Sequence, residues 1–469
     1  MAAADLVALE KVCRAQPTDA RAWHTLGLAF RAEQRMTEAI AALSKSVELA
    51  PKDLVTAMDY GQTRHACGLP AADFLCALSK KWPDHLGATR LAAAALESEG
   101  YRQQAEVMLE AALTRHPGWL EGHKMITTQR YTAGAVHGFD DSYLVACRTQ
   151  PRNMALRLAW FYTLVMLRDW PAAARVLDEG EALMGSAQSI TLGRLYIACE
   201  TFDEARAENL LQQTEWIIDA GVDLCRTRYY LRCGRIAQAE ATATRLSLGP
   251  SSRLAWPYLG IIWRLRGDSR VQWLDGSPPY IRHCELGMSA AALRELAVIL
   301  RQLHTAQAPY FEQSVRGGTQ TNGQLFFRQE PIIQATKKQL IGAIGDYVRS
   351  LPPFDDGHPI KGVDGERILF QGSWSVRLQS QGFHVSHTHP MGRISSAFYV
   401  SLPDTTQFGR PPAGWIQLGT PPPELGLGLG PYAEVEPRAG RLVLFPSTMW
   451  HSTAPFDDGE RLAIAFDVC

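Results

Sequence analysis

Five prolines recur at nearly constant spacing through the first third of the chain. They lie at Pro17, Pro51, Pro83, Pro117 and Pro151, which gives steps of 34, 32, 34 and 34 residues. So regular a period is typical of a chain built from repeated structural units. Proline cannot continue a helix, so each one marks the end of a helical stretch. A generic helical bundle is the alternative, but it has no reason to space its prolines in this way. The period therefore predicts an array of helical repeats.

The residues between the prolines indicate two helices per repeat. Within residues 20–51, the pattern marks a first helix at Trp23, Leu26, Gly27 and Phe30, and a second at Ala39 and Leu43. These positions resemble the tetratricopeptide repeat. Weaker matches follow, so we expect about seven repeats over residues 20–253 and a capping helix near residues 254–266. Stacked helix pairs form a superhelix whose concave surface commonly binds peptides or protein segments.

The pattern changes after Gly267. Residues 273–279 read WLDGSPP, a turn-rich break. Helical spacing returns over residues 287–306 and 331–351. The intervening QSVRGGTQTNGQLFF, residues 313–327, has too much Gly and Thr for a helix and is interpreted as a loop that can enter a strand.

Short β-rich segments fill the last hundred residues. They read RILFQGSWSVRLQS, GFHVSHTHP, ISSAFYVSLP, GWIQLG, AEVEP, GRLVLFP and ERLAIAFDV, separated by Gly and Pro turns. Such a series predicts a β-sandwich or barrel. We therefore expect three parts: a repeat array with its capping helix over residues 1–267, a linker with supporting helices over 268–366, and a barrel core over 367–469.

Four histidines lie in the strand region, and three of them form a candidate metal site. Residues two apart in a strand face the same side, so His387 and His389 can point into a barrel together while His384 points away. His451 follows GRLVLFPS, at the end of a later strand. Two histidines from one strand and one from a distant strand can hold a metal and leave one face open. Imidazole suits Fe, Zn and Cu. The alternative is a set of hydrogen-bonded core or surface histidines.

Arg461 strengthens the case for a site that binds a small molecule. It lies ten residues after His451 and begins the last predicted strand, where Ala463, Ala465 and Asp467 share its face. Two alanines leave a cavity with a cation at its wall, and a guanidinium group is suited to a carboxylate ligand. A surface salt bridge is the alternative for Arg461 taken alone.

These residues resemble a known family, the 2-oxoglutarate- and Fe(II)-dependent oxygenases that carry N-terminal tetratricopeptide repeats. The similar stretches are QSVRGGTQT, HTHPMGRISSAFYVSLP, GRLVLFPSTMWHS and ERLAIAFDV, and residues 270–469 are the part most closely similar. The resemblance implies a double-stranded β-helix, or jelly roll. It also implies that His387 and His451 bind iron and that Arg461 binds the distal carboxylate of 2-oxoglutarate.

Three further residues are candidates for the 2-oxoglutarate pocket. By the resemblance, Ser395 matches a family serine and Tyr399 an aromatic residue on the same strand. Ser395, Ala397 and Tyr399 alternate onto one face, so the serine and the tyrosine could both line the pocket. Arg393 follows the HxH motif and could bind a carboxylate of 2-oxoglutarate or of the substrate; a surface charge is its alternative.

The chain departs from the family pattern at two positions. The widespread motif is HxD or HxE, whereas the second position here is His389, and Ser396 stands where Gly is frequent. A third imidazole leaves the Fe(II) centre at a charge of 2+, which dianionic 2-oxoglutarate can partly offset. Two arrangements stay open. All three histidines may bind the metal, or His387 and His451 bind it while His389 is a neighbour or contacts substrate. Three-histidine iron sites also occur in thiol dioxygenases of the related cupin barrel, which do not use 2-oxoglutarate.

Composition limits the partners and the compartment. Lys and Arg number 47 against 48 Asp and Glu, so the formal charge of −1 gives no basic field for nucleic acid or an anionic membrane. No run of 18 apolar residues occurs, and the N-terminal MAAADLVALEKVC lacks the apolar stretch of a signal peptide. Nine cysteines without a CxxC pair favour a reducing compartment, so we expect a cytoplasmic protein.

Together these features predict a dioxygenase that uses Fe(II) and 2-oxoglutarate to hydroxylate an unactivated C–H bond. The repeat array suggests a peptide or protein substrate, or a protein partner. Two alternatives belong to other classes: a repeat-based binding scaffold with an inactive barrel, and a three-histidine dioxygenase that does not use 2-oxoglutarate.

Overall fold

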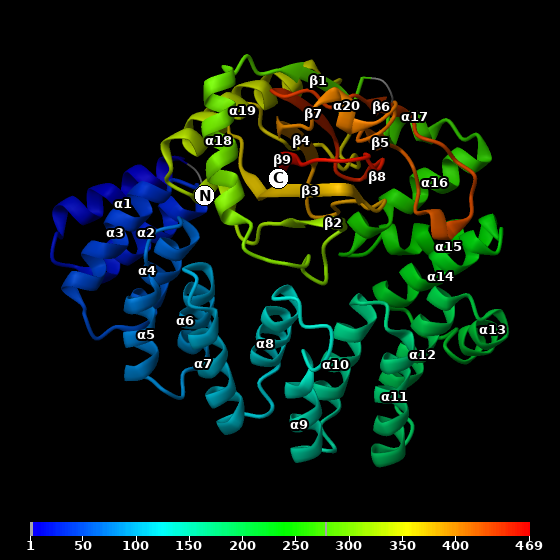
Figure 1. Ribbon diagram of the computed structural model, residues 1–469, viewed down its shortest axis with the longest axis horizontal. Coiled ribbons are helices and arrows are strands. Elements are labelled where there is room, and N and C mark those ends of the chain that lie inside the picture. The colour runs from blue at the N-terminus through cyan, green and yellow to red at the C-terminus, as the bar shows by residue number, and fades with distance from the viewer. Residues whose placement is uncertain (1–2, 277–278) are drawn as a thin grey trace. The chain divides into compact units, whose positions relative to one another are not determined.

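The computed structural model describes residues 3–276 and 279–469, which form two compact units (Figure 1). The first unit comprises Met1–Gln150 and Gly323–Lys337, and the second comprises Pro151–Asn322 and Lys338–Cys469. Each unit is described by itself below. The predicted domain limits at residues 267 and 366 remain predictions.

Paired helices fill the first unit. Its consecutive helices are α1 (Ala3–Ala15), α2 (Ala20–Ala32), α3 (Met36–Leu49), α4 (Leu54–Ala66), α5 (Ala72–Lys81), α6 (Leu86–Ser98), α7 (Arg102–Arg115), α8 (Leu120–Thr132) and α9 (Asp141–Thr149). The Asp19 side chain accepts hydrogen bonds from the backbone N–H groups of Arg21 and Ala22, which fixes the start of α2. A Cβ atom at Gly27 would lie 2.6 Å from Leu43 Cγ. The small residues of the repeat pattern therefore mark close helix contacts.

The same pairing continues in the second unit. Its helices begin with α10 (Met154–Met166), α11 (Trp170–Met184), α12 (Gln188–Thr201), α13 (Glu204–Gln213), α14 (Ala220–Arg232), α15 (Ile236–Ser247), α16 (Trp256–Arg266) and α17 (Arg270–Leu274). Across the described residues, α2/α3 through α14/α15 make seven pairs, and α16 follows at the predicted place of the capping helix. The predicted repeat array is therefore confirmed.

Two antiparallel sheets form the C-terminal region. The strands are β1 (Arg282–Glu285), β2 (Val315–Gln320), β3 (Phe370–His384), β4 (Ile394–Ser401), β5 (Ile416–Leu418), β6 (Ala433–Val435), β7 (Arg441–Pro446), β8 (His451–Thr453) and β9 (Arg461–Val468). Six pair in the order β1-β7-β4-β9-β3-β2, and three in the order β6-β5-β8. One apolar core joins side chains from both sheets, including Tyr399 and Phe445 from the larger and Ile416 and Leu418 from the smaller. The arrangement agrees with the predicted jelly roll.

Helices and short turns complete this region. The predicted supporting helices are confirmed as α18 (Ala290–Leu303) and α19 (Pro331–Ser350), and α18 packs against β4. Single turns occur at η1 (Ser252–Leu254), η2 (Leu325–Phe327), α20 (Thr405–Phe408) and η3 (Pro423–Leu425). No helix in the described ranges is long and apolar enough to span a membrane.

The strands differ from the predicted ones in two places. The segment GFHVSHTHP is not a separate strand, because β3 runs unbroken from Phe370 to His384 and ends before the HxH motif. The glycine-rich segment predicted as a loop contains β2, which pairs with β3. Gly317 of β2 has a φ of 65°, and a Cβ atom there would lie 2.9 Å from Gly382 Cα. The glycines therefore serve a close strand crossing rather than a loop.

Candidate active site

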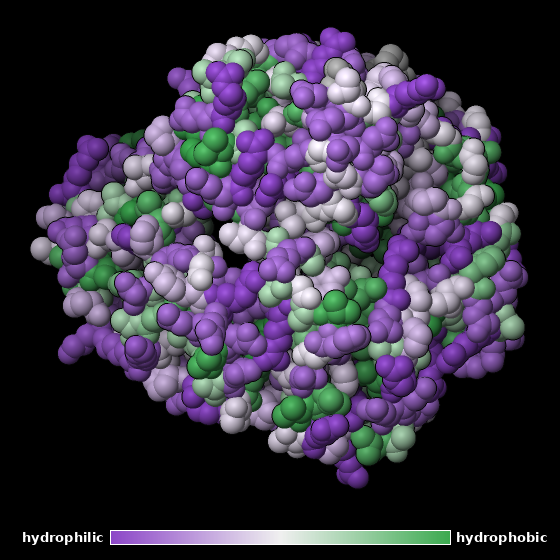
Figure 2. Space-filling view, in the orientation of Figure 1, coloured by the Kyte–Doolittle hydropathy of each residue, from purple (hydrophilic) through white to green (hydrophobic). Residues whose placement is uncertain are grey.

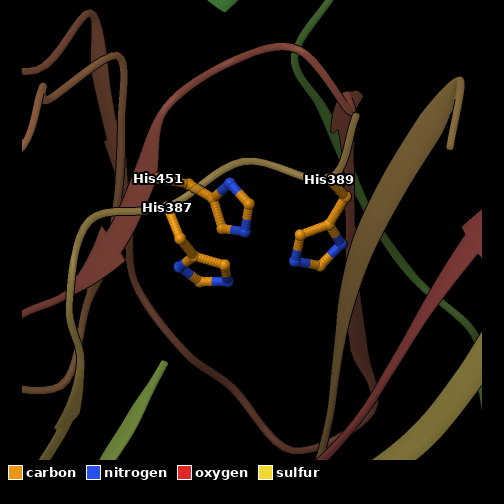
Figure 3. A group of neighbouring side chains, drawn as sticks. All are labelled: His387, His389 and His451. Carbon is orange, nitrogen blue, oxygen red and sulfur yellow. The ribbon is translucent and has the colours of Figure 1, made fainter. Parts of the chain in front are cut away.

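Three histidine rings point toward one another in the C-terminal region (Figure 3). His387, His389 and His451 each offer one ring nitrogen, and these atoms lie within 4.8 Å of one another. His387 and His451 exchange two backbone hydrogen bonds of 3.0 Å, and the His389 N–H donates to the Ser447 carbonyl at 2.9 Å. His451 begins β8 rather than ending the preceding strand. The structure thus brings the three predicted histidines together.

Two of the rings are oriented by neighbouring backbone carbonyls. His387 Nδ1 lies 2.8 Å from the Val385 carbonyl oxygen, and His451 Nδ1 lies 3.0 Å from that of Met449. A carbonyl only accepts, so each Nδ1 carries the proton and each Nε2 keeps its lone pair, which in His387 lies 3.1 Å from the Ser314 hydroxyl. Burial lowers the pKa of His387 to about 3 and that of His451 well below its usual value. Both rings are therefore neutral near pH 7, as metal ligands must be.

The third ring is held by a carboxylate that the sequence analysis did not identify. His389 Nδ1 lies 2.7 and 2.8 Å from the two carboxylate oxygens of Asp467. The Ser395 hydroxyl donates to the same carboxylate at 2.6 Å and lies 2.8 Å from the Ser447 hydroxyl. This places a negative charge directly behind His389. The family's usual carboxylate ligand is replaced here by a histidine, and the Asp467 carboxylate contacts that histidine on its Nδ1 side.

His384 lies beside the cluster, contrary to the prediction that it points away. Its ring stacks on that of His387 with 5.6 Å between centroids, and the Ser314 hydroxyl lies 2.9 Å from His384 Nδ1 and 3.1 Å from His387 Nε2. The prediction failed because it assumed continuous strand alternation. The strand ends at His384, so the next residues no longer alternate.

Arg461 is buried in the same cavity. Its side chain is 3% exposed, and its guanidinium carbon lies 4.9 Å from the centroid of the Tyr399 ring. Arg461 Nε and the Tyr399 hydroxyl are both buried without a hydrogen-bond partner in the described residues. Burial raises the pKa of Tyr399 despite the nearby cation, so its hydroxyl keeps its proton. These groups provide unused donors for an anionic ligand.

The other two predicted 2-oxoglutarate contacts lie elsewhere. Arg393 donates to the backbone carbonyls of Pro359 and Lys361, so the structure does not bring its guanidinium to the histidines. Ser395 is fully buried and directs its hydroxyl to Asp467. The structure thus gives Arg393 backbone partners and gives Ser395 the carboxylate that holds His389, and their predicted contacts with 2-oxoglutarate remain predictions.

A cavity of about 960 Å³ opens in front of the histidines, entirely within the second unit. Arg461, Ala463, Ala465 and Asp467 all line it, in agreement with their predicted shared face. The opposite wall comes from the repeat helices. It includes Met166 of α10, Trp170 of α11, Tyr196 and Glu200 of α12, Arg228 of α14 and Tyr258 of α16. No motif in the repeats indicated that they would form part of this cavity.

Comparisons with known proteins agree with this organisation. Residues 372–467 match the family model described as Putative 2OG-Fe(II) oxygenase, and residues 20–53 match a tetratricopeptide repeat model. A solved tetratricopeptide repeat protein from Parabacteroides merdae is 12% identical with a TM-score of 0.34, over 52% of this chain and 98% of that one. A solved prolyl-4-hydroxylase from Pseudomonas putida is 17% identical with a TM-score of 0.27, over 40% of this chain and 91% of that one. No curated protein sequence matches the chain. The chain thus combines tetratricopeptide repeats with a domain of the Putative 2OG-Fe(II) oxygenase family.

Proposed function

We propose that the protein is a 2-oxoglutarate- and Fe(II)-dependent dioxygenase that hydroxylates a peptide or protein substrate. His387, His389 and His451 would hold the iron, and Arg461 would bind the distal carboxylate of 2-oxoglutarate. The observation that carries this proposal is Arg461 itself, a buried cation in the same cavity as the histidines. It forms no ion pair within the described residues, and an isolated buried charge is costly. An anion from solution would satisfy it.

The donor set fits iron. Neutral imidazoles bind Fe(II), and three of them from one side leave coordination positions for other ligands. Asp467 fixes the tautomer of His389 and offsets part of the metal's charge through the ring. When bound, Fe(II) would activate O₂, and 2-oxoglutarate would supply two electrons and yield succinate and CO₂ as the substrate is hydroxylated.

The chain's own residues would position the cosubstrate and keep water out. The guanidinium group of Arg461 can donate two parallel hydrogen bonds to one carboxylate, and the Tyr399 hydroxyl can donate a third. Ala463 and Ala465 leave the space between this pair and the histidines. Trp374, whose ring lies 5.4 Å from that of His389, and the buried Trp450 cover the site with apolar surface.

Arg461 separates this proposal from a repeat scaffold with an inactive barrel, which has no use for an anion site. A three-histidine dioxygenase that does not use 2-oxoglutarate could place the same cation against a substrate carboxylate, so titration with 2-oxoglutarate separates that alternative. An inactive barrel would also have no need of three histidine rings that converge on one cavity. For the rest of the chain, the repeats support a peptide or protein substrate and the balanced charge supports neither nucleic acid nor membrane. The cysteine content supports a cytoplasmic location.

The test is binding and turnover without any added substrate. Anaerobic protein is loaded with Fe(II), 2-oxoglutarate is titrated by its charge-transfer absorbance, O₂ is admitted and succinate is measured. We expect one Fe(II) per chain, saturable 2-oxoglutarate binding and slow succinate formation. His451→Ala should lose the iron, whereas His283→Ala, an exposed histidine of β1, should keep it. Iron binding without 2-oxoglutarate binding would contradict the proposal and support a cupin-type site.

A further inference from the structure

The part of the cavity wall that the repeats form carries three large apolar side chains that are not fully buried in the core. Met166 is 49% exposed and Tyr196 is 37% exposed, and both line the cavity. The ring of Trp170, which also lines it, lies 6.3 Å from that of Tyr196 at an angle of 51°. On the face drawn in Figure 2, hydrophobic side chains form only small, separate patches among hydrophilic ones. Single exposed apolar residues are ordinary, but three together inside a cavity indicate a binding surface.

The polar groups on the same repeat wall are already paired with one another. Glu200 accepts two hydrogen bonds from Arg228, at 2.8 and 3.1 Å, and Arg228 also donates to the Tyr258 hydroxyl at 3.0 Å. Burial of the Tyr196 hydroxyl near Glu200 raises its pKa to about 12, so this tyrosine stays neutral. The network fixes helices α12, α14 and α16 to one another. The network therefore makes this wall rigid, and the charges of Glu200 and Arg228 already neutralise each other.

The charges that line the whole cavity balance. Four arginines line it, at positions 168, 228, 316 and 461, against four acidic residues at positions 200, 312, 424 and 467. Arg168 pairs with Glu424 at 3.0 Å, so this part of the rim is also neutral. Away from Arg461 and the histidines, a strongly charged ligand therefore gains little from this lining, whereas an apolar group gains from leaving water.

We infer that Met166, Trp170 and Tyr196 form the subsite that recognises a bulky apolar side chain, Leu, Met or Phe, on a neutral peptide substrate. The inference rests on the proposed function, because the subsite and the histidines line the same cavity. The repeats would then determine specificity at the reacting centre itself, in addition to any recruitment along their length. Methionine adapts to several side-chain shapes, and the two aromatic rings supply flat apolar area. We therefore expect the subsite to select peptide side chains by their size and polarity.

The test is peptide binding without turnover. Pools of capped, otherwise neutral nonapeptides carry Leu, Met or Phe at the centre in one pool, Gly in a second, and Asp or Lys in a third. Each is dialysed anaerobically against the full chain with Mn(II) and 2-oxoglutarate, and again without them, and retained peptide is counted by mass spectrometry. We expect the apolar pool to be retained about tenfold over the other two, the gain for burying one large side chain.

Variants locate the effect on the wall. Tyr196→Ala and Met166→Ala should each reduce the enrichment about fivefold. Tyr196→Phe should keep it, because the ring is retained. Leu183→Ala is the matched control, since Leu183 lies on α11 with a similar exposure of 47% but outside the cavity lining. Equal retention of all pools, retention of none, or an enrichment that survives Tyr196→Ala would overturn the inference. Failure of the proposed function is a separate result, the absence of succinate from the parent chain.

Discussion

Arg461→Met should stabilise the ligand-free protein while abolishing its response to 2-oxoglutarate. The arginine is 3% exposed and its Nε has no hydrogen-bond partner in the described part of the chain. Burying an unpaired ion costs several kcal/mol, of which the contact with the Tyr399 ring returns about 2 kcal/mol. Methionine has a similar length and no charge. We therefore expect the free energy of unfolding to rise by about 1–3 kcal/mol, which for a unit of this size is ~1–2 °C for each kcal/mol.

The assay is thermal unfolding with and without 2-oxoglutarate, with Mn(II) present throughout to prevent turnover. The parent should gain about 2.7 kcal/mol at a 2-oxoglutarate concentration 100 times its Kd, and Arg461→Met should gain nothing. Arg461→Lys, which keeps the charge but loses two-point contact, should respond weakly. Arg441→Met is the matched control: Arg441 is also buried, at 8% exposed, but pairs with Glu285 at 2.8 Å, so its loss should destabilise. An Arg461→Met protein that unfolds earlier and still responds to 2-oxoglutarate would refute the reasoning.

Three further predictions follow from single contacts. Asp467→Asn should weaken Fe(II) binding about 10–100-fold by isothermal titration, because the ring that it holds loses a charged partner; unchanged affinity would remove it from the site. Burial raises the pKa of Asp275, which accepts from Tyr432, to about 7, so the folded state holds the proton longer than the unfolded state. The free energy of unfolding should then fall as pH rises from about 4 to about 7. In urea unfolding, Asp275→Asn should abolish this pH dependence, and at pH 8 the variant should be more stable than the parent by roughly 2–4 kcal/mol. Gly27→Ala should cost about 1–3 kcal/mol in the same assay, because its Cβ would overlap Leu43; no loss would mean that α2 and α3 can separate freely.

The repeat array could be predicted because its determinants are local. Each repeat depends on a helix stop and on small residues where its own two helices cross, and both recur with the period of the chain. The strands were harder to delimit, because pairing depends on distant segments. Gly317 and Gly318 look like a loop in the sequence, yet they permit β2 to cross close to β3. The short β1 pairs with β7, which lies more than 150 residues away, and nothing in its own four residues indicates this.

The candidate site divides in the same way. Alternation along β9 correctly placed Arg461 and Asp467 on the cavity face. It could not show that Asp467 meets His389, because that contact joins a strand to a loop whose path the sequence does not determine. The contacts of Ser314 with His384 and His387 could not be predicted either, because Ser314 lies in a glycine-rich stretch with no motif that indicates a role.

One apolar cluster of the second unit contains side chains from both the repeats and the C-terminal region. One cluster joins Leu231 of α14 and Ile262 of α16 to Leu425 and Trp450. The Trp450 indole N–H donates to the Pro257 carbonyl at 3.0 Å, and Arg264 donates to the Gly419 carbonyl at 2.7 Å. Trp450 is also the residue directly before His451, so the packing of α16 bears on the position of a candidate metal ligand. A change in the last repeats can therefore alter the histidine cluster through the core, without touching the metal or the substrate.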